Sequence, residues 1–198
     1  MPTSIDELHT FLRTRRSIRR FKPDSVPAEV IEKILATAGY APSAHNLQPW
    51  RFVVITTPTV KIELGKVLTN AMRADMLSEG TNESDIERRV TTSLRRLDEA
   101  PVVILLCRDA TAVRADTPEE VTMGIQSTGL AGLQLLLAAH AEGLGGNWIC
   151  WPLYAVEETR KVMDLPEYWE PQAMFNIGWA HENQEVTKQM DTCKVIFL

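Results

Sequence analysis

Apolar residues recur at two spacings along the chain, and these spacings predict helices alternating with short buried strands. Over Val30–Ala38 they fall three and four positions apart, as on one face of a helix. Phe52–Ile55 and Pro101–Cys107 are unbroken apolar runs, which predicts strands buried on both faces. Glu119–Glu142 is almost entirely apolar and predicts a long, central, buried helix.

Residues at the ends of these patterns predict where elements begin and stop. Ser4 and Glu7 have the spacing of a capping box, so a helix is expected over Ser4–Leu12. Pro27 and Gly39 bracket the helix around Val30–Ala38. Further helices are expected over Pro58–Met76, Ser84–Leu97 and Val156–Met163, and further strands over Asn147–Trp151 and Ala173–Ala180. The polar connection Arg108–Pro118 is expected to be mobile.

The element order indicates an α+β fold, because helices and strands mix without regular βαβ alternation. A central mixed or antiparallel sheet flanked by helices is expected. With no repeat or linker-like boundary, residues 1–198 are predicted to form one domain. The apolar tail Lys194–Leu198 leaves two alternatives, an edge strand on its own sheet or an arm pairing with a partner's sheet.

Composition narrows the class of protein. The chain has 198 residues, 44% of them hydrophobic, and a net charge of −5, which excludes disorder and argues against a bulk-basic nucleic-acid binder. Three scattered cysteines without a CxxC or His/Cys cluster indicate neither a disulfide scaffold nor a zinc site. The N-terminus has no signal-like apolar run, and the apolar stretch Gly129–Ala141 is too short to span a bilayer. A soluble, cytoplasmic protein with no membrane or nucleic-acid partner is expected.

The segment Arg13–Arg20 concentrates arginine in an otherwise acidic chain. Arg15, Ser17 and Arg19 alternate, so an extended backbone would point all three the same way. Guanidinium groups bind phosphate in a bidentate manner, and a serine hydroxyl adds a donor. A phosphate site, a solvated basic turn and a nucleic-acid arm remain open at this point.

Two further segments have the composition of ligand-binding loops. Pro42–Trp50 holds small polar and amide residues between prolines, and Gly143–Pro152 combines glycines with two tryptophans. The glycines match neither a P-loop nor a dinucleotide fingerprint, so a helix end followed by a core strand is the plainer interpretation. His45 has no recognisable nucleophile to pair with, and a lone loop histidine is more often structural.

Taken together, these segments make the chain resemble the nitroreductase family of FMN-dependent enzymes. The resemblance covers nearly the whole chain, and the order and spacing of four blocks make it specific. The blocks are Arg15–Phe21, Ala41–Phe52, Leu135–Gly145 and Phe175–Ala180.

The resemblance implies an FMN site between two subunits of a homodimer. The FMN phosphate would be held by Arg15, Arg16, Ser17 and Arg19, with Lys188 as the basic residue near the C-terminus. The partner subunit's loop would contribute the positions Pro42, Ser43, Ala44 and Asn46. Cys150 and Trp151 would offer backbone amides near flavin N5.

The implied activity is oxidoreduction of a small-molecule substrate, with no catalytic side chain because flavin N5 carries the hydride. NADH or NADPH would be the electron donor, with ping-pong kinetics. The segments Met72–Asp75, Asp85–Val90, Glu99–Pro101 and Asp164–Pro171 are similar to the nitroreductase-like domain of the bifunctional gamma-glutamyl ligase of deazaflavin-coenzyme biosynthesis. This implies an unsaturated deazaflavin precursor as acceptor, and Arg73 as either an anion contact or a solvated helix residue. A nitroaromatic or quinone reductase and a non-catalytic flavin or deazaflavin binder are the alternatives.

Overall fold

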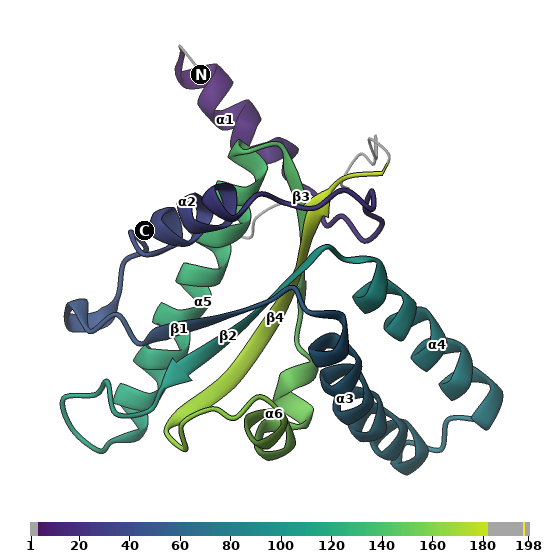
Figure 1. The fold of residues 1–198 in the computed structure, drawn as a ribbon. Coiled ribbons are helices and arrows are strands. Elements are labelled where there is room, and N and C mark those ends of the chain that lie inside the picture. Colours follow the sequence, from purple (N-terminus) through teal and green to yellow (C-terminus); the bar gives the residue numbers. More distant parts are fainter. Residues whose placement is uncertain (1–3, 182–195, 197–198) are drawn as a thin grey trace.

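A four-stranded antiparallel sheet lies at the centre of the protein (Figure 1). A computed structural model describes residues 4–181 and residue 196. The strands lie in the order β1-β2-β4-β3, and every neighbouring pair is antiparallel. In chain order the elements are α1 (Ile5–Thr14), α2 (Ala28–Ala38), η1 (Ala44–Asn46), β1 (Trp50–Ile55), α3 (Pro58–Ser78), α4 (Glu83–Glu99), β2 (Val102–Asp109), α5 (Pro118–Ala141), β3 (Leu144–Ile149), η2 (Trp151–Tyr154), α6 (Val156–Val162) and β4 (Trp169–Trp179). The predicted α+β fold is confirmed.

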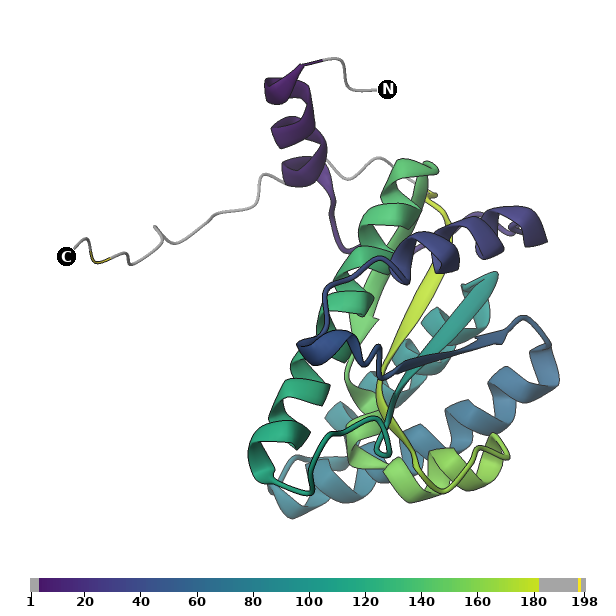
Figure 2. The same cartoon turned by 90° about the vertical axis from the view of Figure 1, so that its left-hand side faces the viewer.

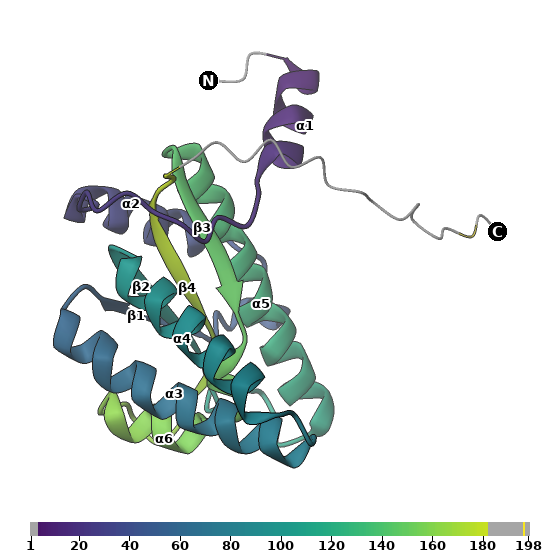
Figure 3. The ribbon, with the colours of Figure 1, turned by 90° about the vertical axis from the view of Figure 1, so that its right-hand side faces the viewer.

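Helices cover both faces of the sheet, which explains why β2 is apolar from Val102 to Cys107. Side chains alternate along the strand, so Ile104 packs in one hydrophobic cluster with α2 and α5, whereas its neighbour Leu105 packs in another with α3. Both side chains are fully buried. Figure 3 shows the sheet between α5 on one side and the α3–α4 pair on the other.

Helix α5 is the long central helix that the apolar pattern predicts. Its Gly132 lies so close to β3 that an added Cβ would be 2.3 Å from the Trp148 ring. By length and composition α5 is apolar enough to cross a membrane, and 44% of its most apolar window is buried. A helix packed in the core of a fold passes the same test, and packing against the sheet accounts for the buried apolar face of α5, whereas Ile125, Leu130 and Leu133 are exposed.

The glycines after α5 belong to β3, not to a loop before it. The sequence predicts a strand over Asn147–Trp151, but β3 begins at Leu144, and Trp151 opens the short helix η2. Only Gly143, with φ +76°, ends the helix as expected. A Cβ on Gly146 would lie 2.6 Å from Ile177, so close packing, rather than a turn, requires glycine there.

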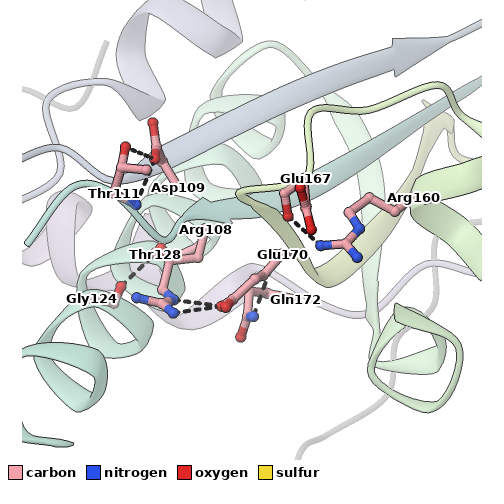
Figure 4. Close-up of polar contacts among 9 residues, drawn as sticks. All are labelled: Arg108, Asp109, Thr111, Gly124, Thr128, Arg160, Glu167, Glu170 and Gln172. Carbon is pink, nitrogen blue, oxygen red and sulfur yellow. Dashed lines mark hydrogen bonds and ion pairs between the residues drawn. The ribbon is translucent and has the colours of Figure 1, made fainter. Parts of the chain in front are cut away.

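The prediction of a mobile polar connection over Arg108–Pro118 is wrong for its first two residues. Arg108 and Asp109 are instead the buried end of β2 (Figure 4). Arg108 pairs with Glu170 of β4 at 2.6 Å and packs its aliphatic stem over Gly124 of α5. Asp109 accepts hydrogen bonds from the backbone and hydroxyl of Thr111 at 2.9 and 2.6 Å. These contacts fix the start of the connection to β4 and α5.

The segment after α1 adds to the free edge of β3. The capping box at the start of α1 is present, with Ser4 and Glu7 bonded to each other's backbone, but α1 buries no residue and projects from the body (Figure 2). Beyond it, Ser17 forms a parallel bridge to Gly146, and the backbone N–H of Ile18 donates to the Gly146 carbonyl at 3.1 Å. A Cβ on Gly145 would lie 2.7 Å from the Ile18 Cβ, so this junction has no spare room.

We expect Gly145→Ala to destabilise the protein by roughly 1–3 kcal/mol, the usual cost of overpacking. Ile18→Ala alone removes partly buried apolar surface, but in the Gly145→Ala background it also removes Cγ1 and Cγ2, two of the three Ile18 atoms that the new Cβ would approach within 3 Å. The double variant should therefore lose less free energy of unfolding than the sum of the two single variants. Urea unfolding of the four proteins measures this, and strictly additive losses would contradict the packing described.

Candidate functional site

A cavity of about 340 Å³ lies between α4 and the β3–β4 edge of the sheet. Its lining combines the end of β3 and η2 with α4 and with Arg19 from the segment that follows α1. The lining residues are Arg19, Arg89, Ser93, Arg96, Leu97, Asn147, Trp148, Ile149, Cys150, Trp151, Tyr154, Met174 and Asn176. Three of them are arginines and none is acidic, although the whole chain carries a net charge of −5.

Two buried asparagines face each other across β3 and β4 at the floor of this cavity. Asn147 and Asn176 are register partners and are only 5% and 1% exposed. The Asn176 amide donates to the Arg96 carbonyl at 3.2 Å, but the Oδ1 atoms of both asparagines accept no hydrogen bond. A buried polar atom without a partner costs free energy, so these oxygens indicate a ligand that donates hydrogen bonds there.

Arginine provides the positive charge of the cavity. Within residues 4–181, no carboxylate pairs with the guanidinium groups of Arg19, Arg89 or Arg96. All three side chains are exposed. The cavity therefore offers cationic donors at its mouth and amide acceptors at its floor, a combination suited to a polar, anionic ligand.

The other predicted phosphate residues lie further along the same edge. Ser17 is held by its bridge to β3. Arg15, Ser17 and Arg19 occupy every second position of the chain. Arg16 donates to the carbonyl oxygens of Arg13 and Arg15, so here its side chain closes the C-terminus of α1. Lys188 lies outside the described residues.

The predicted loop Pro42–Asn46 lies on the other face of the sheet from the cavity. The backbone N–H of Ala44 donates to Ser127 of α5 at 3.1 Å, which fixes the loop beside that helix. His45 and Asn46 have φ angles of 53° and 55°, an unfavourable region for non-glycine residues. His45 itself lies against Arg114 at 3.1 Å. Within one chain, therefore, Pro42, Ser43, Ala44 and Asn46 do not meet the arginine segment.

The predicted Cys150 and Trp151 do meet Arg19 in the cavity. The Trp148 indole N–H lies 3.1 Å from the Cys150 Sγ, which holds the exposed thiol at the cavity rim. Burial raises the pKa of the other described thiol, Cys107, to about 12. That thiol stays protonated, and it lies in the sheet core rather than at the site.

Sequence reasoning missed the asparagines and the α4 arginines. A lone asparagine in a strand gives no signal, because only the fold shows that it is buried without a partner. The arginine doublets of α4, in contrast, are visible at 88–89 and 95–96. Their seven-residue spacing places one member of each doublet on the same helix face. Arg73, which the sequence singled out, is held by Glu87 at 2.8 and 3.0 Å.

The chain is similar over most of its length to known proteins. The sequence model of the nitroreductase family matches residues 12–179. The 5,6-dimethylbenzimidazole synthase of Rhodobacter capsulatus is 33% identical over 182 residues, covering 89% of this chain and 84% of that protein.

Two solved structures have a similar fold. A BluB-like flavoprotein from Clostridium difficile 630 superposes with a TM-score of 0.78 at 25% identity, covering 96% of this chain and 99% of that one. An FMN-dependent nitroreductase from Clostridium difficile R20291 superposes with a TM-score of 0.71 at 26% identity, covering 94% and 96% of the two chains.

Docking of α1 is expected to depend on pH through His140, the basic residue in the last turn of α5. Its ring stacks on Phe11 of α1 with centroids 4.8 Å apart, and Nε2 lies 3.2 Å from the Thr14 hydroxyl. Burial lowers the pKa of His140, and the charges of Arg15 and Arg16 act in the same direction, outweighing a hydrogen bond with the Phe11 backbone.

Because the folded pKa lies below the unfolded value of about 6.5, the unfolded chain binds the proton more tightly. The contribution of neutral His140 to the free energy of unfolding is complete above a pH of about 6.5. It is lost as the pH falls below that value through the pKa of His140 in the folded protein. Melting temperatures of the native protein and His140→Gln should therefore diverge above pH 6.5 and converge below it. An identical pH dependence in both proteins would refute this role.

Proposed function

Because the chain belongs to the nitroreductase family and is an oxidoreductase of that family, we propose that it binds FMN in the cavity between α4 and β3. The observation that carries this proposal is the pair of buried, unpartnered Oδ1 atoms of Asn147 and Asn176 beside the unpaired Arg19. The flavin ring of FMN has an imide N–H that donates hydrogen bonds and carbonyl groups that accept them, and the ribityl chain ends in a phosphate. The residues present therefore fit FMN.

In this assignment the phosphate end is held along the outer edge of β3. Arg15, Arg16 and Ser17 bind the phosphate, with Lys188 completing the site, and Arg19 reaches the ring. The backbone of Cys150 and Trp151 lies beside the redox-active edge of the ring. When bound, FMN supplies hydride chemistry at N5, so no side-chain nucleophile is required. The electron donor is NADH or NADPH, and donor and acceptor use the same space in turn, with ping-pong kinetics.

The proposed active form is a homodimer in which the loop Pro42–Asn46 completes the partner's site. Apolar side chains exposed on α5 and α1 support this proposal. On α5, Ile125, Leu130 and Leu133 are 43–47% exposed, and on α1, Ile5 is 74% exposed. An interface over these faces would bury them. It would also give a role to the strained loop, which Ala44 anchors to α5.

The proposed acceptor is an unsaturated deazaflavin-coenzyme precursor. This choice rests on the segments between Met72 and Pro171 that resemble the nitroreductase-like domain of the bifunctional gamma-glutamyl ligase. Quinones and nitroaromatics are the alternative acceptors, and a flavin or deazaflavin binder without turnover is the alternative class. A second candidate activity is formation of 5,6-dimethylbenzimidazole, favoured by the 33% identity to a synthase of that compound over 89% of this chain. Mass spectrometry of anaerobic and aerobic mixtures containing reduced FMN tests for that product directly.

An absorption spectrum of the purified protein, followed anaerobically on adding NADH or NADPH, tests the central proposal. We expect flavin absorption that bleaches with one or both nicotinamides, and the faster reaction identifies the donor. Flavin absorption that persists with both would favour the non-catalytic binder. A colourless protein that also fails to bind added FMN would refute the cofactor assignment.

Replacing Arg15 and Arg19 together with alanine should release FMN, because two of the proposed cationic contacts along the β3 edge are removed. We expect at least a tenfold rise in the FMN dissociation constant, the effect of losing about 1.4 kcal/mol or more of charge-assisted bonding. Flavin content after gel filtration measures it. The matched control is Arg88→Ala combined with Arg95→Ala, since these exposed residues lie on α4 and pair with Asp85 and Glu99. Equal flavin content in both double variants would contradict the assignment.

A further inference from the structure

The arginines of α4 divide into two sets with different surroundings. Arg88 pairs with Asp85 at 2.6 Å, and Arg95 pairs with Glu99 at 3.8 Å, so a carboxylate of the same helix balances each. Arg89 and Arg96, one residue further along in each doublet, have no carboxylate partner within residues 4–181. A spacing of seven residues places these two on one face of the helix, and Ser93 lies between them.

This face of α4 lines three adjoining hollows, and Arg89 belongs to all of them. The first is the cavity of about 340 Å³ assigned to FMN. The second, of about 300 Å³, continues past Trp151 and Tyr154 towards Met72 of α3. The third, of about 520 Å³, runs along α4 and shares Ser93 and Arg96 with the first. Arg89 therefore stands where the proposed cofactor cavity opens towards solvent.

Asp75, Glu79 and Asp85 line the second and third hollows, whereas the lining of the first has three arginines and no carboxylate. The positive charge of the first cavity therefore exceeds what one FMN phosphate requires. That phosphate is assigned to the edge of β3, where Arg15, Arg16 and Ser17 supply the donors. The α4 arginines lie across the cavity from that edge, and the two aromatic side chains of η2, Trp151 and Tyr154, line the same opening. Unpaired guanidinium groups beside aromatic rings are a chemistry for holding a planar molecule with a negatively charged tail.

We propose that Arg89, with Ser93 and Arg96, binds the anionic tail of the planar reactant that exchanges electrons with the cofactor. The inference rests on the proposed function and extends it by naming the class of reactant: an aromatic or quinonoid ring carrying a carboxylate, sulfonate or phosphate group. The same chemistry is present in a charged acceptor and in the phosphate groups of a nicotinamide donor. Arg73 cannot serve this role, because Glu87 occupies its guanidinium in a bidentate pair.

Calorimetric titration of the FMN-loaded protein with 2-naphthalenesulfonate and 2-naphthol tests the binding site without turnover. The two probes share a ring system and differ in charge. We expect the sulfonate to bind at least tenfold more tightly than the naphthol at low salt, with the difference shrinking as salt is raised. Arg89→Gln should weaken sulfonate binding about tenfold and leave naphthol binding unchanged. Arg95→Gln is the matched control, because this exposed arginine lies outside the three hollows and pairs with Glu99.

The two half-reactions then show whose tail is bound. In stopped-flow experiments, Arg89→Gln should slow either flavin reduction by NADH or NADPH, or reoxidation by 1,2-naphthoquinone-4-sulfonate relative to uncharged 1,2-naphthoquinone. An effect confined to reduction assigns the site formed by Arg89, Ser93 and Arg96 to the donor, and one confined to the charged quinone assigns that site to the acceptor.

Three results would overturn the inference: equal affinity of the native protein for the two probes, unchanged sulfonate affinity in Arg89→Gln, or release of FMN by that substitution. The last would make Arg89 a cofactor ligand. Failure of the proposed function would be seen in a result different from these three. A protein that prefers the sulfonate through Arg89, yet is reduced by neither nicotinamide, would retain the anion site and lose the assigned activity.

Discussion

The contact between Ile18 and Gly145 is the constraint on which the candidate site depends. The arginine segment joins the sheet only because β3 presents bare backbone at this point, and an added Cβ would lie 2.7 Å from that of Ile18. The bridge from Ser17 to Gly146 fixes the segment in register. Since side chains alternate in extended backbone, packing Ile18 inward turns Ser17 and Arg19 to the opposite side. One apolar residue on two glycines thereby determines where the cationic side chains lie.

The same glycines account for a part of the fold that the sequence did not predict. A strand that begins Leu-Gly-Gly-Asn has no alternating apolar pattern, and glycine is unfavourable in strands when only local preference is considered. Its conformation is set by neighbours distant in sequence, namely Ile18 at Gly145 and Ile177 at Gly146. Where the pattern is local and strong, as in β2 and α5, the predictions hold to within a few residues. Where tertiary contacts decide, as in β3, the predicted boundary is three residues late.

A similar division separates the site residues that sequence identified from those it missed. Arg19 lies in the arginine segment, and Cys150 and Trp151 lie in the segment Gly143–Pro152; the structure gathers these three residues in one cavity. Asn147 and Asn176 contribute through burial and an unsatisfied oxygen, which are properties of the folded chain. Arg108 shows the converse error. It looked like the start of a polar loop, but its ion pair with Glu170 and its packing on Gly124 place it in the interior. Polarity alone did not reveal this, because a buried arginine is rare unless it is paired.

The distribution of charge on α4 connects the fold to the proposed chemistry. In an acidic chain, an arginine is stabilised most simply by a carboxylate one helical turn away, and Arg88 and Arg95 have that arrangement. Asp85 and Glu99 also lie one helical turn from Arg89 and Arg96, but these carboxylates pair with Arg88 and Arg95. Between Arg89 and Arg96 the helix carries Ser93, and the cavity beside Arg19 has no carboxylate in its lining. Uncompensated positive charge concentrated in a hollow focuses the local potential and attracts anions, even when the net charge of the protein is negative. The helix that closes one side of the cavity is therefore also the element best placed to select which charged molecules enter it.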